Sequence, residues 1–418
     1  MLNLKAVYTP KIANKHLLFN GRFLLLWLGQ AISQIGDGLN RVALLWFVYL
    51  LTGSASKMAI IGVLQAIPAI ALGLIAGAYL DRHSKKRTMI LSDLIRFALM
   101  ILIPTLHYLH LLSFLTLCVC VFIISVVSTF FGPALTTSIP LLVEKERLRE
   151  ANSILQTAAY MGVLLGPSVA GLFIPILGAP NVLYIDAMTF FISAVCIIPI
   201  RIKEPFDQVA RNANMKQAIN DIKEGVRFVF LDNKVILTVI MIALVSNFSL
   251  TPIPLLFSVF SEKVLWSGPR AMGYLLSALG LGALGTSLVL ASIKKNFKES
   301  LMIGLALGMV GMIFLVMTKL HSLPPVLILS ILIGSCTTII NIFFVTTIQI
   351  QSPVNMLGRV FTTFSTTTQI ATPIGLMTAG ILLDSLGIVR TLISFGLFML
   401  GTSLIILMMK PLGKLKAR

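Results

Sequence analysis

The chain has 418 residues, of which only 11% are charged, and a formal net charge of +18 at pH 7. Its mean hydropathy is +0.96. Soluble domains carry roughly 25% charged residues, so this composition excludes a soluble globular enzyme and indicates a polytopic helical membrane protein. Basic loops kept on the cytoplasmic side of a membrane explain the positive charge, which therefore does not indicate a nucleic-acid partner.

Twelve apolar segments follow one another along the chain, and each has the ~20 residues that a helix needs to cross a bilayer. Several are longer than a bilayer requires, which allows a tilt or an extension beyond the membrane. We predict spanning helices at about 22–51, 57–80, 88–109, 111–142, 151–178, 181–200, 235–260, 270–293, 300–319, 323–350, 358–386 and 389–410.

The basic residues decide the orientation of these segments. With both termini cytoplasmic, 26 Lys and Arg side chains fall in inner segments and only 5 in outer loops, while Arg41 and Arg96 lie inside helices. Cytoplasmic loops carry an excess of Lys and Arg. We therefore expect a multi-pass protein of the cell membrane with both termini in the cytoplasm. No cleavable signal peptide is evident before the first span.

The longest polar stretch, residues 201–234, divides the chain almost in half. Apolar residues recur within it at helical spacing, which predicts an amphipathic helix on the inner leaflet, with a flexible solvated linker as the alternative. These residues are Met215, Ile219, Ile222, Val226 and Val229. The predicted domains are an N-terminal bundle over 1–200, a cytoplasmic central loop over 201–234 and a C-terminal bundle over 235–418.

The two halves look like weak repeats of each other. In each half a polar inner loop leads into a helix with a Pro fifteen residues on, over 152–167 in the fifth helix and 358–373 in the eleventh. The sequence thus predicts an all-α membrane protein with twelve transmembrane helices in two pseudo-symmetric six-helix bundles.

A short basic loop between the second and third predicted helices carries the most specific motif. Gly77 and Asp81 stand before or at the start of a cationic run, Arg82, Lys85, Lys86 and Arg87. Such a loop should stay cytoplasmic, and a plain positive-inside loop is the alternative interpretation. The spacing resembles the Gly-x-x-x-Asp-Arg-x-Gly-Arg-Arg/Lys signature of the major facilitator superfamily, with Ser84 where that family prefers Gly.

This resemblance implies the major facilitator fold and a gate at the cytoplasmic side. The residues expected to form the gate motif are Gly77, Asp81, Arg82, Lys86, Arg87, Asp93 and Arg96. Asp93 and Arg96 are three residues apart near the inner end of the third predicted helix, and we expect them to clamp the gate together with Asp81 and Arg82.

The fifth predicted helix holds two small residues one turn apart, Gly162 and Gly166, which let a neighbouring backbone approach closely. Pro167 removes a helix hydrogen bond and invites a bend. With Gly171, these residues resemble the Gly-x-x-x-Gly-Pro-x-x-Gly-Gly pattern of drug:proton antiporters in the same superfamily, although Ala170 replaces the penultimate Gly.

Further stretches narrow the resemblance. Residues 35–46, 142–152, 225–229 and 358–361 are similar to the branch of the superfamily that contains macrolide-efflux proteins and the enterobactin exporter. These signatures are short and do not fix a substrate.

Asp37 and Arg41 lie four residues apart in the first predicted helix and so share a face. Counted from Arg22, Asp37 lies at a depth of roughly 22 Å, at about 1.5 Å per residue, in a hydrocarbon core of about 30 Å. A carboxylate persists there only if it faces a cavity or has a partner. Asp37 is predicted either to handle protons or a cationic substrate, or to form a permanent pair with Arg41. Gly36 and Gly38 should keep the nearby surface open, which favours an accessible site.

Uncharged polar residues inside other spans are candidates for the lining of the same cavity, with a helix-to-helix hydrogen bond as the alternative role of each. These residues are Gln30, Gln65, Asn247, Asn341 and Gln369. Asp186 and Asp384 lie close to the predicted outer ends of the sixth and eleventh helices, where a solvated or helix-packing role is expected.

Metal and nucleotide chemistry are not indicated. The sequence has no Gly-x-x-x-x-Gly-Lys-Ser/Thr phosphate loop, so the energy does not come from ATP hydrolysis within this chain. The cysteines and histidines lack metal-ligand spacing, and we expect no metal site and no cofactor.

These features predict a secondary active transporter that exports an amphipathic or hydrophobic, drug-like small molecule by proton antiport, with alternating access to a midplane cavity. A siderophore exporter or a lysophospholipid flippase of the same fold is the alternative. An enzyme or a receptor would need a polar catalytic cluster or a large ligand-binding loop, and neither is predicted. The expected partners are the substrate, protons and the lipid bilayer, and we expect a monomer.

Cysteine-accessibility labelling tests the orientation. Cysteines introduced at Lys57 or Arg270 should react with membrane-impermeant reagents from outside the cell, because both positions are predicted to be external. Cysteines at Lys86 or Lys295 should react only from the cytoplasmic side. The reverse labelling pattern would contradict the predicted topology.

Overall fold

The computed structural model describes residues 20–80, 83–144, 147–202, 227–292, 299–353 and 356–408, and these residues are almost entirely helical. The elements in chain order are α1 (Gly21–Thr52), α2 (Ala55–Leu80), α3 (Lys85–Tyr108), α4 (Phe114–Leu142), α5 (Leu148–Leu177), α6 (Ala179–Ile197), the short π-helix η4 (Phe228–Asp232), α8 (Lys234–Leu250), α9 (Ile253–Lys263), α10 (Gly268–Ser292), α11 (Glu299–Met317), α12 (Leu323–Gln351), α13 (Leu357–Gln369) and α14 (Ala371–Met408).

Side-chain caps fix the starts of several helices. Asn20, Ser84, Ser113 and Asn233 each accept a hydrogen bond from a backbone N–H in the first turn, of α1, α3, α4 and α8 respectively. Such a cap satisfies a donor that has no partner inside the helix and is worth about 1 kcal/mol. The polar residues of the short loops thus set where the apolar helices begin.

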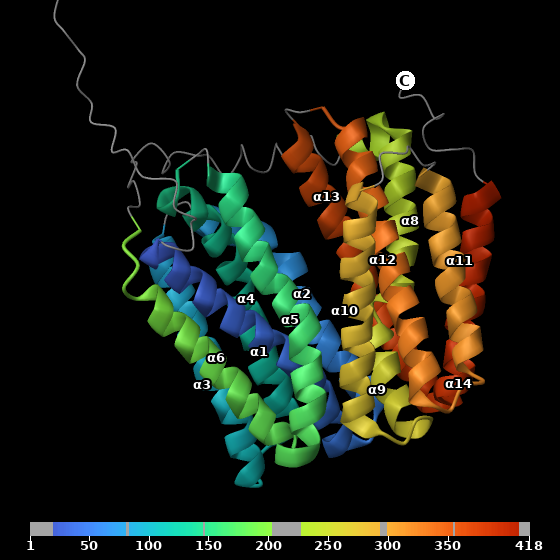
Figure 1. The fold of residues 1–418 in the computed structure, drawn as a ribbon, viewed down its shortest axis with the longest axis horizontal. Helices are drawn as coiled ribbons and strands as arrows, with labels where there is room; N and C mark the ends of the chain where they lie inside the picture. Colours follow the sequence, from blue (N-terminus) through green and yellow to red (C-terminus); the bar gives the residue numbers. More distant parts are fainter. Residues whose placement is uncertain are drawn as a thin grey trace, which may run out of the picture.

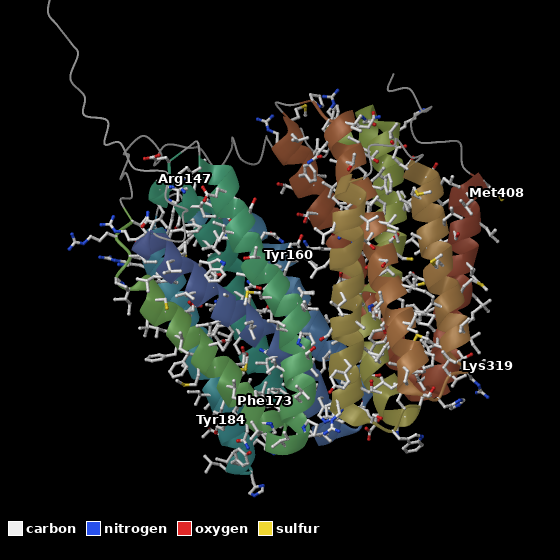
Figure 2. All side chains as sticks on the ribbon, viewed as in Figure 1. Arg147, Tyr160, Phe173, Tyr184, Lys319 and Met408 are labelled. Atoms are coloured by element: carbon white, nitrogen blue, oxygen red, sulfur yellow. The ribbon has the colours of Figure 1, made fainter. Side chains whose placement is uncertain are left out.

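The helices gather into two halves that meet at one end of the molecule and separate at the other (Figure 1). Helices α1 to α6 form the first half, and η4 to α14 form the second. We call the end where the halves meet the closed end; it holds the turns at Gly53 and Gly268. The opposite, splayed end holds the first residues of α1, α3 and α5. In Figure 2, Lys319 marks the closed end and Arg147 the splayed end.

Ten segments of the described residues are long and apolar enough to cross a membrane. One of them, Leu357–Met408, contains two of the predicted spans, because the chain folds back at Gly387, whose φ of 76° lies in the left-handed region. Helix α1 is not among the ten, since polar side chains along it lower its hydropathy. With these two adjustments the twelve predicted spans and the all-α membrane fold are confirmed.

In two spans predicted as continuous helices the helical hydrogen bonding is interrupted at one point, although the backbone there keeps right-handed helical φ and ψ angles. The span 235–260 divides into α8 and α9 at Thr251–Pro252, and the span 358–386 divides into α13 and α14 at Ile370, shortly before Pro373. Proline has no N–H, so neither proline can donate to the carbonyl four residues earlier. Each interruption is therefore explained by a proline in the sequence. The apolar composition of the spans alone does not indicate it.

The first half is held together by a very close approach of α1 and α5. A Cβ on Gly166 would lie only 2.5 Å from the Cα of Gly38, and a Cβ on Gly162 would collide with the carbonyl oxygen of Gln34. In a membrane the packing of small residues is a main source of attraction between helices, because lipid tails are as apolar as the helices. Gly162 and Gly166 thus form a helix-packing face.

A first seam between the two halves joins α5 to α10 toward the closed end. A Cβ on Gly273 would lie 2.7 Å from the Cα of Gly171. The hydroxyl of Ser277 is 2.6 Å from that of Ser168 and donates to the Leu164 carbonyl at 3.0 Å. The same helix α5 therefore packs on α1 with one glycine face and on the second half with another.

A second seam joins α14 to the start of α2. The Asp384 carboxylate accepts hydrogen bonds from Ser54 Oγ at 2.7 Å and from the backbone N–H groups of Ala55 and Ser56 at 2.8 Å and 3.0 Å. A carboxylate at a helix N-terminus satisfies free N–H donors and complements the helix dipole. This helix-packing role matches one of the two roles expected for Asp384.

The predicted amphipathic helix of the central loop falls largely on residues 203–226, which lie outside the described residues. Only the end of that stretch is described, as η4 and the residues next to it. The division of the chain at 1–200, 201–234 and 235–418 stays a prediction.

Gly162→Ala should lower the melting temperature of the detergent-solubilised protein, because the added Cβ has to displace the Gln34 carbonyl of α1. Overpacking of this kind costs about 1–3 kcal/mol. The matched control is Gly401→Ala in α14, where nothing lies within 4 Å of the added Cβ, and this change should not lower the melting temperature. Equal melting temperatures for the two variants would contradict the close α1–α5 contact.

Candidate functional site

A cavity of about 560 Å³ lies between the two halves. Helices α1, α2 and α5 supply one wall, and α8, α9, α10, α12 and α14 supply the other. Most of the lining side chains are apolar, and the polar ones are Asn40, Arg41, Gln65, Thr251, Thr337 and Thr372. Sites for drug-sized molecules typically measure about 300–1,000 Å³ and combine apolar walls with a few polar groups. The cavity fits that description.

Arg41 is the one charged residue among those that line the cavity, and its side chain is exposed there. Asp37 lies one turn earlier on α1, but no ion pair joins it to Arg41 within the described residues. The charge of Arg96 on α3 acts on the Asp37 carboxylate more strongly than that of Arg41. In this structure Arg41 therefore faces the cavity, whereas Asp37 is influenced mainly by Arg96 inside the first half.

Asp93 and Arg96 lie inside the first half and form a buried ion pair through Asp93 Oδ1 and Arg96 Nη2. The Arg96 guanidinium carbon lies 4.7 Å from the ring centroid of Phe131 and 4.3 Å from that of Phe190. A desolvated cation over an aromatic ring is stabilised by about 2 kcal/mol or more. The two rings hold the guanidinium in place, on α3, between α4 and α6.

Asp186 of α6 completes this group. It is fully buried, and no ion pair within 4.0 Å joins its carboxylate to a cation among the described residues. Asp37 and Arg96 act on it electrostatically, and Asn40 and Thr189 lie beside it. A solvated position for Asp186 is therefore excluded. We call Asp37, Asp93, Asp186 and Arg96 the charge cluster.

Glycine explains how α1 comes close enough to α6 to form the charge cluster. A Cβ on Gly36 would lie 2.7 Å from Asp186 Oδ1 and 2.9 Å from Thr189 Cβ, while Gly38 packs against α5. The expectation that Gly36 and Gly38 keep the nearby surface open is wrong, because both are buried under neighbouring helices. Their small size instead brings Asp37 next to the other carboxylates.

The uncharged polar candidates are scattered. Gln65 lines the cavity, and Asn341 is exposed on α12, one turn beyond the cavity residue Thr337. Gln30 is buried within the first half, and its Nε2 has no partner in the described part of the chain. Gln369 donates from Nε2 to a serine one turn earlier, at 3.1 Å.

The predicted gate motif is only partly described. Asp81 and Arg82 lie outside the described residues, and Gly77 is described only as part of the α2 backbone. Lys86 Nζ donates to the carbonyl at the end of α6, at 2.6 Å, and Arg87 is exposed at the start of α3. Asp93 and Arg96 lie two to three turns deeper along α3, in the charge cluster. The gate stays a prediction.

The broken helices supply cavity residues that the sequence analysis did not single out. Thr251 and Thr372 both line the cavity, and their hydroxyls are 3.5 Å apart. Asn247 Nδ2 donates to the Thr368 carbonyl at 3.2 Å and so joins α8 to α13. The signal in the sequence is the Thr-Pro dipeptide that occurs in both spans.

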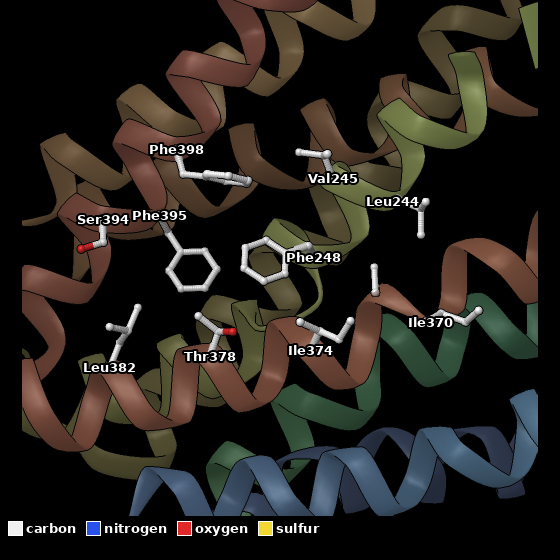
Figure 3. Close-up of a pocket in the computed structure, with 11 residues that line it drawn as sticks. Leu244, Val245, Phe248, Ile370, Ile374, Thr378, Leu382, Ser394, Phe395 and Phe398 are labelled. Carbon is white, nitrogen blue, oxygen red and sulfur yellow. The ribbon is translucent and has the colours of Figure 1, made fainter. Parts of the chain in front are cut away.

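A second hollow, of about 450 Å³, lies behind these breaks, between α8 and the two arms of α14 (Figure 3). Phe248, Phe395 and Phe398 gather on one side of it, and Phe248 lies 5.8 Å and 5.4 Å from the other two ring centroids. None of its lining residues is charged. This hollow therefore offers no charged group to a ligand, unlike the central cavity with Arg41.

A family model described as a transmembrane secretion effector matches residues 17–417. The chain belongs to this family of major facilitator transporters. It is similar to the multidrug efflux pump Tap of Mycolicibacterium fortuitum, at 26% identity over 388 residues, which cover 91% of this chain and 93% of that protein. It is also similar to macrolide efflux protein A of Streptococcus pyogenes, at 25% identity over 402 residues, with 94% and 97% covered.

Solved structures of major facilitator transporters have the same fold. The nucleoside transporter NupG superposes with a TM-score of 0.73 at 12% identity, over 94% of this chain and all of that one. A transporter of the POT family superposes with a TM-score of 0.69 at 13% identity, over 92% and 95%. The predicted major facilitator fold of this transporter is confirmed.

Arg96→Gln should destabilise the transporter, because it removes the cation that three carboxylates share. Breaking a buried ion pair from one side costs about 3–5 kcal/mol. The loss in melting temperature should shrink as the pH is lowered, because protonated carboxyl groups no longer repel one another.

The control for this experiment is Arg390→Gln, which removes an exposed cation near the closed end and should leave the melting temperature almost unchanged at every pH. If Arg96→Gln lowered the melting temperature only slightly, or by the same amount at every pH, Arg96 would not be the cation that stabilises the three carboxylates.

Proposed function

We propose that this transporter exports an amphipathic or hydrophobic small molecule in exchange for protons, by alternating access to the central cavity. The observation that carries the proposal is the charge cluster, in which three carboxylates share one arginine inside the first half, next to the cavity. Ionisable residues inside membrane spans are costly and commonly belong to proton or substrate pathways.

Charge balance supports proton binding at the cluster. Three ionised carboxylates around Arg96 would leave a net negative charge in a region of low dielectric, which is strongly unfavourable. Asp186 is fully buried, and the neutral side chains of Asn40 and Thr189 beside it do not cancel its charge. We therefore infer that the cluster holds at least one proton in the state described here.

Helix α1 links this proton to the cavity. Asn40 lines the cavity and also lies beside Asp186, while Asp37 and Arg41 are one turn apart on the same helix. A substrate that contacts Arg41 or Asn40 changes the field and the hydrogen bonds at Asp37 and Asp186. The binding of the substrate and the protonation of the cluster are then thermodynamically linked, and antiport requires that the bound substrate favour release of the proton.

The basic residues support a cytoplasmic splayed end. Arg22, Lys85 and Arg147 lie at that end, at or near the starts of α1, α3 and α5. In that orientation the cavity is on the path from the cytoplasm, where cargo for export is collected. The two seams at the closed end would open, and the gate motif at Asp81 to Arg87 would close, when the halves rock to release cargo outside.

The curated relatives favour a drug-like cargo, since their names state multidrug and macrolide efflux. The largely apolar cavity is consistent with a hydrophobic or amphipathic molecule. Raised drug tolerance on overexpression would support this cargo, whereas altered phospholipid turnover would support a lysophospholipid flippase.

Asp37→Asn should abolish the part of efflux that depends on the pH gradient, because the cluster then loses one proton-binding carboxylate. The measurement uses cells that express the transporter and are loaded with Nile red, a neutral amphipathic dye. Efflux after energisation is followed with and without nigericin, which collapses the pH gradient.

The matched control for this variant is Glu144→Gln, which neutralises an exposed carboxylate at the splayed end. It should retain nigericin-sensitive efflux at the wild-type rate. Nigericin-sensitive efflux by Asp37→Asn at the wild-type rate, in protein that inserts normally, would show that Asp37 does not couple export to protons.

A further inference from the structure

We infer that the central cavity selects amphipathic molecules with an acidic head group, such as a carboxylate, sulfonate or phosphate, over those with a cationic head group. The Arg41 guanidinium is the group that favours the acidic head group. The inference rests on the proposed export function and names the substrate class of the same site.

The charge on the lining of the cavity is of one sign, positive. Arg41 is charged and exposed, and the other polar groups of the lining are the neutral side chains of Asn40, Gln65 and three threonines. No carboxylate belongs to the described lining. A cleft whose low-dielectric walls carry charge of a single sign focuses the field and concentrates ions of the opposite sign.

The carboxylates nearest to Arg41 are not arranged to neutralise it. Asp37 lies within 4.0 Å of no cation in the described part of the chain, and it is influenced more by Arg96 than by Arg41. Asp93 on α3 and Asp186 on α6 are fully buried within the first half and do not belong to the cavity lining. The Arg41 guanidinium therefore faces the cavity without an ion-pair partner among the described residues.

The exposed Arg41 guanidinium can accept a ligand without breaking an existing ion pair. An acidic head group forms two parallel N–H···O bonds with the planar guanidinium, the strongest hydrogen-bonding arrangement that arginine offers. A cationic head group would add a second positive charge to the same low-dielectric space, where like charges repel strongly.

The opposite wall suits the rest of such a molecule. Leu255, Leu276, Leu279 and Leu376 of the second half line the cavity and offer an apolar surface. Thr251 and Thr372 add neutral hydroxyls at the helix breaks. A single molecule that binds Arg41 with its head and the leucines with its apolar body would touch both halves at once.

Two dansyl-labelled undecyl chains that differ only in their head group test this inference. One carries a sulfonate and the other a trimethylammonium, and both charges are permanent. Dissociation constants for the purified, detergent-solubilised transporter are measured by energy transfer from tryptophan to dansyl. The wild-type protein should bind the sulfonate probe about tenfold more tightly or better, as a charge-assisted bidentate contact predicts.

Arg41→Gln should weaken binding of the sulfonate probe about tenfold and leave binding of the trimethylammonium probe unchanged or stronger. Arg41→Lys, which keeps the charge but loses the planar fork, should fall between the two proteins. Gln65→Ala is the matched control, since it changes a neutral group of the same lining and should affect both probes alike.

Equal affinities of the wild-type protein for the two probes would overturn the inference, as would a sulfonate preference that persists in Arg41→Gln. The wild-type comparison decides the question even if a variant fails to fold. Export of Nile red separates the two proposals: Nile red export without a sulfonate preference contradicts this inference alone. A sulfonate preference without nigericin-sensitive export contradicts proton antiport alone.

Discussion

The high cost of charge in a low-dielectric interior is the constraint on which this structure depends. Three buried or half-buried carboxylates and one arginine lie within the first half, largely surrounded by protein. The aromatic rings of Phe131 and Phe190 hold Arg96, and Arg96 in turn acts on every carboxylate of the charge cluster. Such an arrangement is sensitive to a single proton, because one proton changes the balance between repulsion and attraction. That sensitivity is what we propose the transporter uses.

Small residues make the charge cluster possible and would also permit the motion of the halves that we propose. Gly36 lets α6 approach α1, and Gly38 with Gly162 and Gly166 lets α5 approach α1 from another side. The seam to the second half also depends on close glycine packing, and the Asp384 contact with the start of α2 joins the halves a second time. Packing of small residues and single polar contacts can break and re-form more readily than a large interlocked apolar interface. On this view the same residue types that fix each half also permit the halves to move apart.

The fold was largely predictable from the sequence, because a membrane imposes long apolar helices and an asymmetric distribution of basic residues. The helix breaks were not predicted, although Pro252 and Pro373 signal them, because a proline inside a transmembrane segment is often accommodated without a break. The ion pair of Asp93 with Arg96 could be anticipated from their spacing along a single helix. The place of Asp186 could not, since it depends on how α6 packs against α1. Periodicity reports on one helix at a time, whereas the charge cluster is a property of three.

Infrared spectroscopy of the substrate-free transporter at neutral pH tests the central claim most directly, because the C=O stretch of a protonated carboxyl group is resolved from that of a carboxylate. We expect a protonated-carboxyl band in the wild-type protein that loses intensity when Nile red is added. We also expect the band to weaken or disappear in Asp37→Asn and Asp186→Asn. A wild-type spectrum without such a band at neutral pH, or with a band that both substitutions leave unchanged, would contradict a proton held within the charge cluster.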